Sequence, residues 1–308
     1  LTGAARSVWQ VGVLRAGAWA ARGLRVPARN ALLADIVPPA AYGRAYGFER
    51  AMDNLGAIGG PVLALLLVGL MGTRNAILVS IVPGILAAFA IVYAIRKAPR
   101  AERREHRPVR LRVRPVLRGR LGRIMIGVSA FELGNCAATL LILRATELLG
   151  PGRPQEDATQ LALGLYVLYN LSATLASIPA GRLGDRWGAV RSLAVGVGCF
   201  GVAYAGLAAG HASVLGLAPW FVAAGVGIGF AETAEHAAVA AFAPEEIRGS
   251  AFGLLAAVQS LGNFAASGVA GMLWTAVSPR AAFVYLAAWM AASLVLLATT
   301  AGPRDTAA

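Results

Sequence analysis

The chain has 308 residues, of which 57% are hydrophobic and only 14% are charged, and its mean hydropathy is +0.64. These values lie far outside the composition of an ordinary soluble domain and are typical of a membrane protein. The 37 glycines fit helices that pack closely in lipid through small side chains. A formal net charge of +13 raises the question of a nucleic-acid partner, which the distribution of the basic residues has to answer.

Apolar stretches of about 20 residues are long enough to cross a bilayer as helices. The sequence predicts nine of them, which we take in chain order as 8–36, 47–71, 75–95, 121–149, 160–181, 189–210, 214–241, 249–274 and 280–300. We therefore expect an all-α polytopic membrane protein.

The third and fourth stretches are separated by a strongly basic segment. Twelve of the 28 Lys and Arg residues lie between Arg96 and Arg123, together with three prolines and no aromatic residue. Without aromatic side chains to stack on bases, nucleic-acid binding is the weaker interpretation. We interpret residues 96–120 as a cytoplasmic linker, and expect the 96–123 stretch to contact anionic lipid headgroups.

The orientation follows from the basic residues of the loops. If the spans alternate and the linker is inside, the inner loops hold 18 Lys and Arg and the outer loops between spans hold 3. This bias predicts a cytoplasmic C-terminus. Cys136 and Cys199 both fall in apolar stretches, and we expect neither a metal nor a cofactor.

A shift of 206 residues aligns the segment 23–56 with 229–262, with 11 identities in 34 positions and no gap. The turn proline and a Gly-x-Ala-aromatic-Gly run coincide, which favours a duplication. The second unit begins near Leu121, so its partner would begin about 85 residues before Leu1, which predicts three preceding helices. We expect a partial N-terminal half at 1–95, the linker, and a six-helix half at 121–308.

One loop carries a family motif. The segment GRLGDRWGAVR resembles the Gly-x-Leu-x-Asp-Arg-x-Gly signature of the major facilitator superfamily, matched by Gly181, Leu183, Asp185, Arg186 and Gly188. The resemblance implies two six-helix halves around a midplane substrate site and transport by alternating access. This chain would then hold the equivalents of helices 4–12 of twelve and lack an N-terminal part.

A second motif resembles the Gly-x-x-x-Gly-Pro core associated with antiporters of this superfamily, matched by Gly56, Gly60 and Pro61. Its small residues are expected to let the helix press against a neighbour, and its proline to kink it. The fuller motif continues with a Gly pair, which this sequence lacks. The resemblance implies proton-coupled efflux as the activity.

The charges beside this motif have two interpretations. Arg44, Glu49 and Arg50 fit a solvated helix start, where interfacial charges cost little. They also fit a gate, in which the loop of Asp185 lies at the start of the helix and its carboxylate binds an Arg and the positive helix end. Asp53, one turn deeper than Glu49, is expected to face protein rather than lipid.

Polar residues also occupy matching positions of the two repeats. Arg29 aligns with Glu235, and an ion pair between them across a substrate cavity is expected; its alternative is a pair that only locks helices together. Charged residues at membrane depth are costly, so an accidental cluster is improbable. The candidate coupling and cavity residues are Arg25, Arg29, Asp53, Glu132, Glu232, Glu235, His236, Gln259 and Asn263.

Glu132 has no evident cationic partner at its own depth, so desolvation favours its protonated form and makes it the leading proton carrier. The sequence thus predicts a monomeric bacterial inner-membrane transporter that exports a small solute in exchange for protons. A polytopic membrane enzyme is the alternative of another class, and the three scattered histidines do not supply its catalytic site. A non-transporting sensor on the same fold is the third. No motif specifies the substrate, and the incomplete antiporter-like motif does not by itself fix the direction of transport or the coupling ion.

Overall fold

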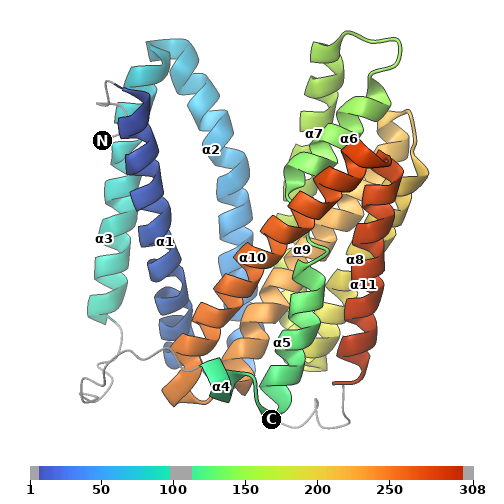
Figure 1. Cartoon of the computed structure of the whole chain (residues 1–308). Coiled ribbons are helices and arrows are strands. Elements are labelled where there is room, and N and C mark those ends of the chain that lie inside the picture. The colour runs from blue at the N-terminus through green and yellow to red at the C-terminus, as the bar shows by residue number, and fades with distance from the viewer. Residues whose placement is uncertain (1–6, 98–112, 301–308) are drawn as a thin grey trace.

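The computed structural model describes residues 7–97 and 113–300, which form helices and no strand. The chain runs back and forth between two ends of the molecule (Figure 1). One end carries Lys97, Val113 and the end of α11, and we call it the linker end. The elements are α1 (Val8–Ile36), η2 (Pro39–Ala41), α2 (Tyr42–Val79), α3 (Ile81–Lys97), α4 (Val113–Val116), α5 (Gly119–Glu132), α6 (Ala138–Leu149), α7 (Gln155–Trp187), α8 (Ala189–Ala209), α9 (Val214–Phe242), η3 (Glu245–Ile247), α10 (Arg248–Ala276) and α11 (Pro279–Ala298).

Six helical stretches of the described ranges are long and apolar enough to cross a membrane: Leu66–Ala90, Gln155–Trp187, Ala189–Ala209, Val214–Phe242, Glu245–Ala276 and Pro279–Ala298. The expected span 8–36 is the charged helix α1, and 121–149 is divided into α5 and α6. The expected span 47–71 belongs to α2, which bends at Gly72. Gly72 has φ +78°, a backbone conformation that glycine adopts without a steric cost.

The internal repeat is visible in the element bounds. Helices α1 and α9 are both 29 residues long, and both ends of α9 lie 206 residues after those of α1. The 3-10 turns η2 and η3, and the starts of α2 and α10, obey the same shift. Even the cap bond is repeated, because Val37 N–H donates to Leu33 O and Ala243 N–H to Val239 O. The duplication inferred from 11 identities is therefore also a duplication of backbone structure.

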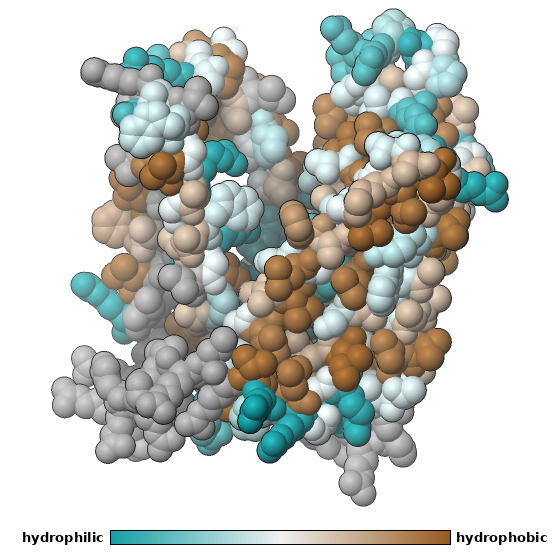
Figure 2. Space-filling view, viewed as in Figure 1, coloured by the Kyte–Doolittle hydropathy of each residue, from teal (hydrophilic) through white to brown (hydrophobic). Residues whose placement is uncertain are grey.

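The helices form two groups that meet at the linker end and separate toward the other end (Figure 1). Helices α1–α3 form one group and α5–α11 the other, with α2 against α7 and α9, and α1 against α10. The outer surfaces of both groups carry many exposed apolar side chains, whereas hydrophilic residues gather at the two ends and in the hollow between the groups (Figure 2). This distribution suits a lipid-facing belt with a polar interior.

Candidate functional site

The two groups are joined at the linker end by the carboxylate of Asp185, in the last turn of α7. Its oxygens accept hydrogen bonds from the backbone N–H groups of Gly43 and Arg44, at 2.7 and 3.2 Å, and from Arg44 Nε at 2.9 Å. Gly43 and Arg44 lie in the first turn of α2, where backbone N–H groups have no intrahelical partner. The positive end of α2 therefore faces a carboxylate. We call these contacts the clasp.

Glycines allow the clasp to form. A Cβ at Gly43 would meet Gly181 O and would lie 2.6 Å from Asp185 Oδ1, and a Cβ at Gly47 would meet Ser177 O. Helices α2 and α7 thus approach to backbone contact along Gly43, Gly47 and Gly181. Small residues at a helix crossing permit this approach.

Two further positions of the loop signature behave differently. Gly188 ends α7 and begins α8 with φ +89°, so the corner requires a residue that tolerates a left-handed conformation. Arg186 is exposed and forms no ion pair with any residue that the structure describes. The clasp therefore uses the carboxylate of the Asp-Arg dipeptide and not its guanidinium.

The antiporter-like motif does not pack as expected. No atom of the described residues lies within 4 Å of a Cβ placed at Gly56 or Gly60. The expectation that these glycines press α2 against a neighbour is wrong for the described part of the chain. The close packing of α2 occurs earlier, at Gly43 and Gly47, because α2 diverges from α7 toward the other end (Figure 1).

A charged cluster lies one to three turns deeper than the clasp. Arg50 is its centre: its guanidinium contacts Glu49 at 2.6 and 2.9 Å, Asp53 at 3.0 Å and Glu232 of α9 at 3.5 Å. Arg29 of α1 forms an ion pair with Glu49 and lies 3.9 Å from Asp53. The side chains of Arg50 and Glu49 are 12% and 15% exposed. The interpretation of this pair as a solvated helix start is therefore wrong, although it fits Arg44.

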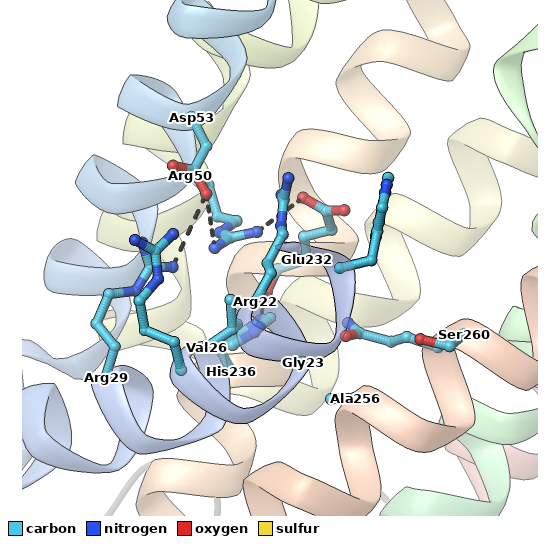
Figure 3. A pocket seen from close by; sticks show the side chains of 13 residues that line it. Arg22, Gly23, Val26, Arg29, Arg50, Asp53, Glu232, His236, Ala256 and Ser260 are labelled. Carbon is cyan, nitrogen blue, oxygen red and sulfur yellow. Dashed lines mark hydrogen bonds and ion pairs between the residues drawn. The ribbon is translucent and has the colours of Figure 1, made fainter. Parts of the chain in front are cut away.

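The cluster forms one wall of a cavity of about 520 Å³ between α1, α2, α9 and α10. Arginines of α1 and carboxylates of α2 and α9 turn toward the same space (Figure 3). The size suits a small-molecule ligand. The lining residues are Trp19, Arg22, Gly23, Arg25, Val26, Arg29, Arg50, Asp53, Glu232, His236, Ala256, Gln259 and Ser260.

The expected ion pair between Arg29 and Glu235 is absent. Arg29 binds the carboxylates of α2, and Glu235 Oε2 accepts a hydrogen bond from Gln259 Nε2 at 2.8 Å. Glu235 is fully buried and does not line the cavity, whereas Glu232 and His236 of the same helix do. Equivalent positions in two repeats lie on equivalent faces, but the competing carboxylates of α2 are closer to Arg29.

His236 does reach the cavity. Its Nδ1 lies 2.7 Å from the carbonyl oxygen of Glu232, one turn earlier on α9. Its ring packs between Tyr46 and Phe252, with centroid distances of 5.7 and 6.1 Å. The imidazole is thus fixed by α2 and α10, which carry equivalent residues of the two repeats.

Glu132 lies at the end of α5, where the chain leaves the helix before α6. Its Oε2 accepts a hydrogen bond from Asn135 Nδ2 at 3.0 Å, and it has no ion pair within the described ranges. Asn263 of α10 donates to Asn135 O at 2.8 Å, so it holds this break in place and does not line the cavity. A Cβ at Gly262 would lie 2.6 Å from Glu132 Cβ, which shows how tightly α10 covers the carboxylate.

The sequence did not predict a second contact between the groups at the linker end. Arg248, the first residue of α10, forms an ion pair with Asp35, in the last turn of α1. From the sequence, Arg248 is predicted only as one of the 18 basic residues of the inner loops. The repeat contains the missing signal, because Arg248 aligns with Tyr42, the first residue of α2, whose hydroxyl also bonds the end of α1 at Ala34 O.

Comparisons with known proteins agree with this architecture. The chain matches the profile of the Major Facilitator Superfamily over residues 1–148 and again over 137–308. It is 30% identical over 267 residues to an uncharacterized MFS-type transporter of Methanocaldococcus jannaschii, covering 86% of this chain and 65% of the relative. It is 26% identical over 276 residues to a gentisate transporter of Corynebacterium glutamicum, covering 86% of this chain and 61% of the relative.

The fold also matches a solved structure. A bacterial homologue of the iron transporter ferroportin, in its outward-facing state, superposes with a TM-score of 0.73 at 17% identity, over 96% of this chain and 75% of that chain. The likeness is to the fold. The chain spans less than two thirds of the length of the curated relatives it matches. With its profile match over the whole length and its repeated helical halves, this multi-pass membrane chain belongs to the Major Facilitator Superfamily, a family of transporters and not of enzymes.

Proposed function

We propose that the protein is a secondary active transporter that moves a small solute by alternating access, and that the cavity between α1, α2, α9 and α10 is its binding site. The observation that carries this proposal is a polar cavity at the meeting of two helix groups which, among the described residues, are held together at the linker end by the clasp and by the ion pair of Arg248 with Asp35. The molecule is hollowed between the groups toward the other end (Figure 2). Rocking the groups about the cavity would expose it at the linker end instead.

The proposed direction is export coupled to proton entry. The support for export is the resemblance of Gly56, Gly60 and Pro61 to the antiporter motif. The support for proton coupling is that Glu132 and Glu235 are buried and hydrogen-bonded to amides rather than to cations. A buried carboxylate without a cationic partner favours its protonated form, so it suits a group that takes up and releases a proton.

The proposed setting is the bacterial inner membrane, with the linker end and the C-terminus in the cytoplasm and the 96–123 segment near anionic lipid. Most of that segment lies outside the described residues. The support is the excess of Lys and Arg in the loops at this end. We propose that the protein acts as a monomer, because one chain supplies both walls of the cavity.

Flux measurements on the full-length protein test the function. The protein is reconstituted in vesicles, a pH difference is imposed, and uptake of a panel of labelled solutes is measured, beginning with gentisate, for which one relative is named. Proton-driven accumulation of any solute supports transport. A protein that binds solutes but carries none of them under any gradient would instead be a sensor.

Glu132→Gln tests the coupling. We expect the variant to lose accumulation driven by a pH difference, yet to keep solute exchange between two equal pools, because exchange requires no net proton transfer. Arg29→Ala is the contrasting variant: it removes one of the two cations that bind Glu49 and Asp53 of α2, leaving Arg50 alone, and is expected to impair exchange and accumulation together. If Glu132→Gln accumulates solute as the wild type does, Glu132 is not the coupling residue.

A further inference from the structure

The cavity contains more cationic than anionic side chains. Its lining includes four arginines and two carboxylates. A third carboxylate, that of Glu49, does not line the cavity but contacts Arg50, which does. The four are Arg22, Arg25, Arg29 and Arg50, and the two are Asp53 and Glu232.

The arginines fall into two classes. Arg29 and Arg50 bind the carboxylates of the charged cluster. Arg22 and Arg25 form no ion pair with any described residue. The guanidinium of Arg22 lies instead over the ring of Trp19, 5.6 Å from its centroid. Two cations of the cavity therefore have no anionic partner in this part of the chain.

Unpaired arginines halfway along a helix are unfavourable at membrane depth. Charged side chains at this depth are costly, and they mark substrate pathways. Arg22 and Arg25 lie near the middle of α1, and both reach the cavity. An anionic ligand that contacts both would supply the missing counter-charge, and a planar guanidinium matches a carboxylate in two parallel hydrogen bonds.

The rest of the cavity leaves room for an organic body. Besides the charged residues, the lining includes Trp19 and the small residues Gly23, Ala256 and Ser260. A cavity of about 520 Å³ accepts a small molecule but not a macromolecule. An aromatic side chain together with small residues in one lining suits a flat or narrow apolar body.

We propose that the cavity binds a small organic monocarboxylate, with its carboxylate on Arg22 and Arg25 and its apolar body beside Trp19. The inference rests on the proposed function, because it names the solute class of the same site. Arg29 and Arg50 remain bound to their carboxylates and form the charged wall of the cavity. The anion is thus recognised by the arginines of α1 that have no protein partner among the described residues.

The test is ligand binding by the full-length protein purified in detergent, measured as the shift of its thermal unfolding midpoint. The probes are benzoate and hexanoate, their neutral amides benzamide and hexanamide, and benzylamine as a cation, with sodium chloride as the salt control. We expect both carboxylates to raise the midpoint with saturation, and the amides, the amine and the salt to leave it unchanged. Equal stabilisation by the amides or the amine, or none by either carboxylate, would overturn the proposal.

Variants on one helical stripe locate the site. Arg22→Gln and Arg25→Gln are each expected to weaken carboxylate binding about 10- to 100-fold, the range for one charge-assisted hydrogen bond. Arg22→Lys keeps the positive charge but loses the planar pair of N–H donors, and its affinity for the carboxylate is expected to lie between those of the wild type and Arg22→Gln. Arg15→Gln is the matched control, because Arg15 lies on the same stripe of α1 but outside the cavity lining. Unchanged binding in Arg22→Gln and Arg25→Gln would refute the placement.

The outcomes separate this inference from the transport proposal. Carboxylate binding without flux of any solute would leave the anion site standing and remove the transport function. Flux of a neutral or cationic solute, with no carboxylate binding, would support the transport function and remove the anion site.

Discussion

The clasp offers the sharpest test of how the linker end is kept closed. In Asp185→Asn the side chain keeps its shape and one carbonyl acceptor, but it loses its charge and its second carboxylate oxygen. Wild-type Asp185 receives hydrogen bonds from Gly43 N–H, Arg44 N–H and Arg44 Nε. The two backbone donors lie at the positive end of α2, so the substitution weakens a charge-assisted contact between the two helix groups.

The magnitude follows from the exposure of each partner. The Arg44 side chain is 60% exposed, so its ion pair with Asp185 contributes at most about 1 kcal/mol. The Asp185 side chain is only 12% exposed, and hydrogen bonds to a charged group contribute about 1.5–3 kcal/mol. Since the amide of the Asp185→Asn variant would keep part of this, we expect the closed arrangement to lose about 2 kcal/mol, or roughly 30-fold in population ratio.

The assay reports access to the cavity from each side of the membrane. Ser260, which lines the cavity, is replaced by cysteine in the full-length protein after Cys136→Ala and Cys199→Ala. A membrane-impermeant maleimide is then applied to right-side-out and inside-out vesicles. We expect Asp185→Asn to increase the labelling rate from the linker side by roughly tenfold or more and to decrease it from the other side, because it weakens contacts that hold the linker end closed in this structure.

The control is Asp157→Asn, in the first turn of α7 at the opposite end of the same helix. It removes the same charge without touching the clasp, and its labelling is expected to match that of the wild type. The reasoning fails if Asp185→Asn leaves access from the linker side unchanged, or if Asp157→Asn increases it equally.

Two further predictions concern stability. Gly181→Ala would place a Cβ against the backbone of Gly43, so we expect a loss of about 1–3 kcal/mol and a lower unfolding midpoint in detergent, whereas Gly164→Ala on the same helix, with no atom within 4 Å, is expected to change little. Arg50→Gln leaves Glu232 without its cation and leaves Glu49 and Asp53 with Arg29 alone, and it is expected to cost about 3–5 kcal/mol in a denaturation assay; adding Glu49→Gln should recover part of that loss. Equal midpoints for the two alanine variants, or a double variant less stable than Arg50→Gln alone, would contradict these accounts.

Much of the helical arrangement could be predicted from the sequence, because the two repeats encode the same arrangement of helices. A shift of 206 residues predicted from identities also relates the ends of α1 to those of α9. Helix ends depend on local signals, such as the proline that begins each 3-10 turn, and these signals survive when side chains on the faces diverge. Family and helical class were therefore predictable from the chain alone, whereas the nine expected spans were not all found: six stretches of the described residues qualify, and the expected span 121–149 is divided into α5 and α6.

Side-chain partners were not predictable from the same shift. The alignment placed Arg29 and Glu235 on equivalent faces and suggested that they pair, yet Arg29 binds Glu49 and Asp53. Pseudo-symmetry fixes the face on which a residue lies, but an ion pair depends on the nearest opposite charge, and that is a property of the packed pair of helices. Gly56 and Gly60 illustrate the same limit, because a motif identifies small residues without saying which neighbour approaches them.

The cavity shows how two copies of one backbone produce an asymmetric site. Val26 and Glu232, Arg50 and Ala256, and Asp53 and Gln259 are pairs of equivalent positions under the 206-residue shift, and both members of each pair line the cavity.

In each of these pairs one member is charged and the other is not. The duplication thus determines which positions line the cavity, and divergence determines their chemistry. Charge on α2 opposite neutral residues on α10 gives the cavity a polar wall and a less polar wall. A solute with a charged end and an apolar body would then bind in one orientation, whereas a symmetric cavity would accept either. Such a solute would place its charged end at the same wall each time it binds. Its contacts with the two halves would then differ, and contacts that differ between conformations are what allow a solute to shift the equilibrium between them.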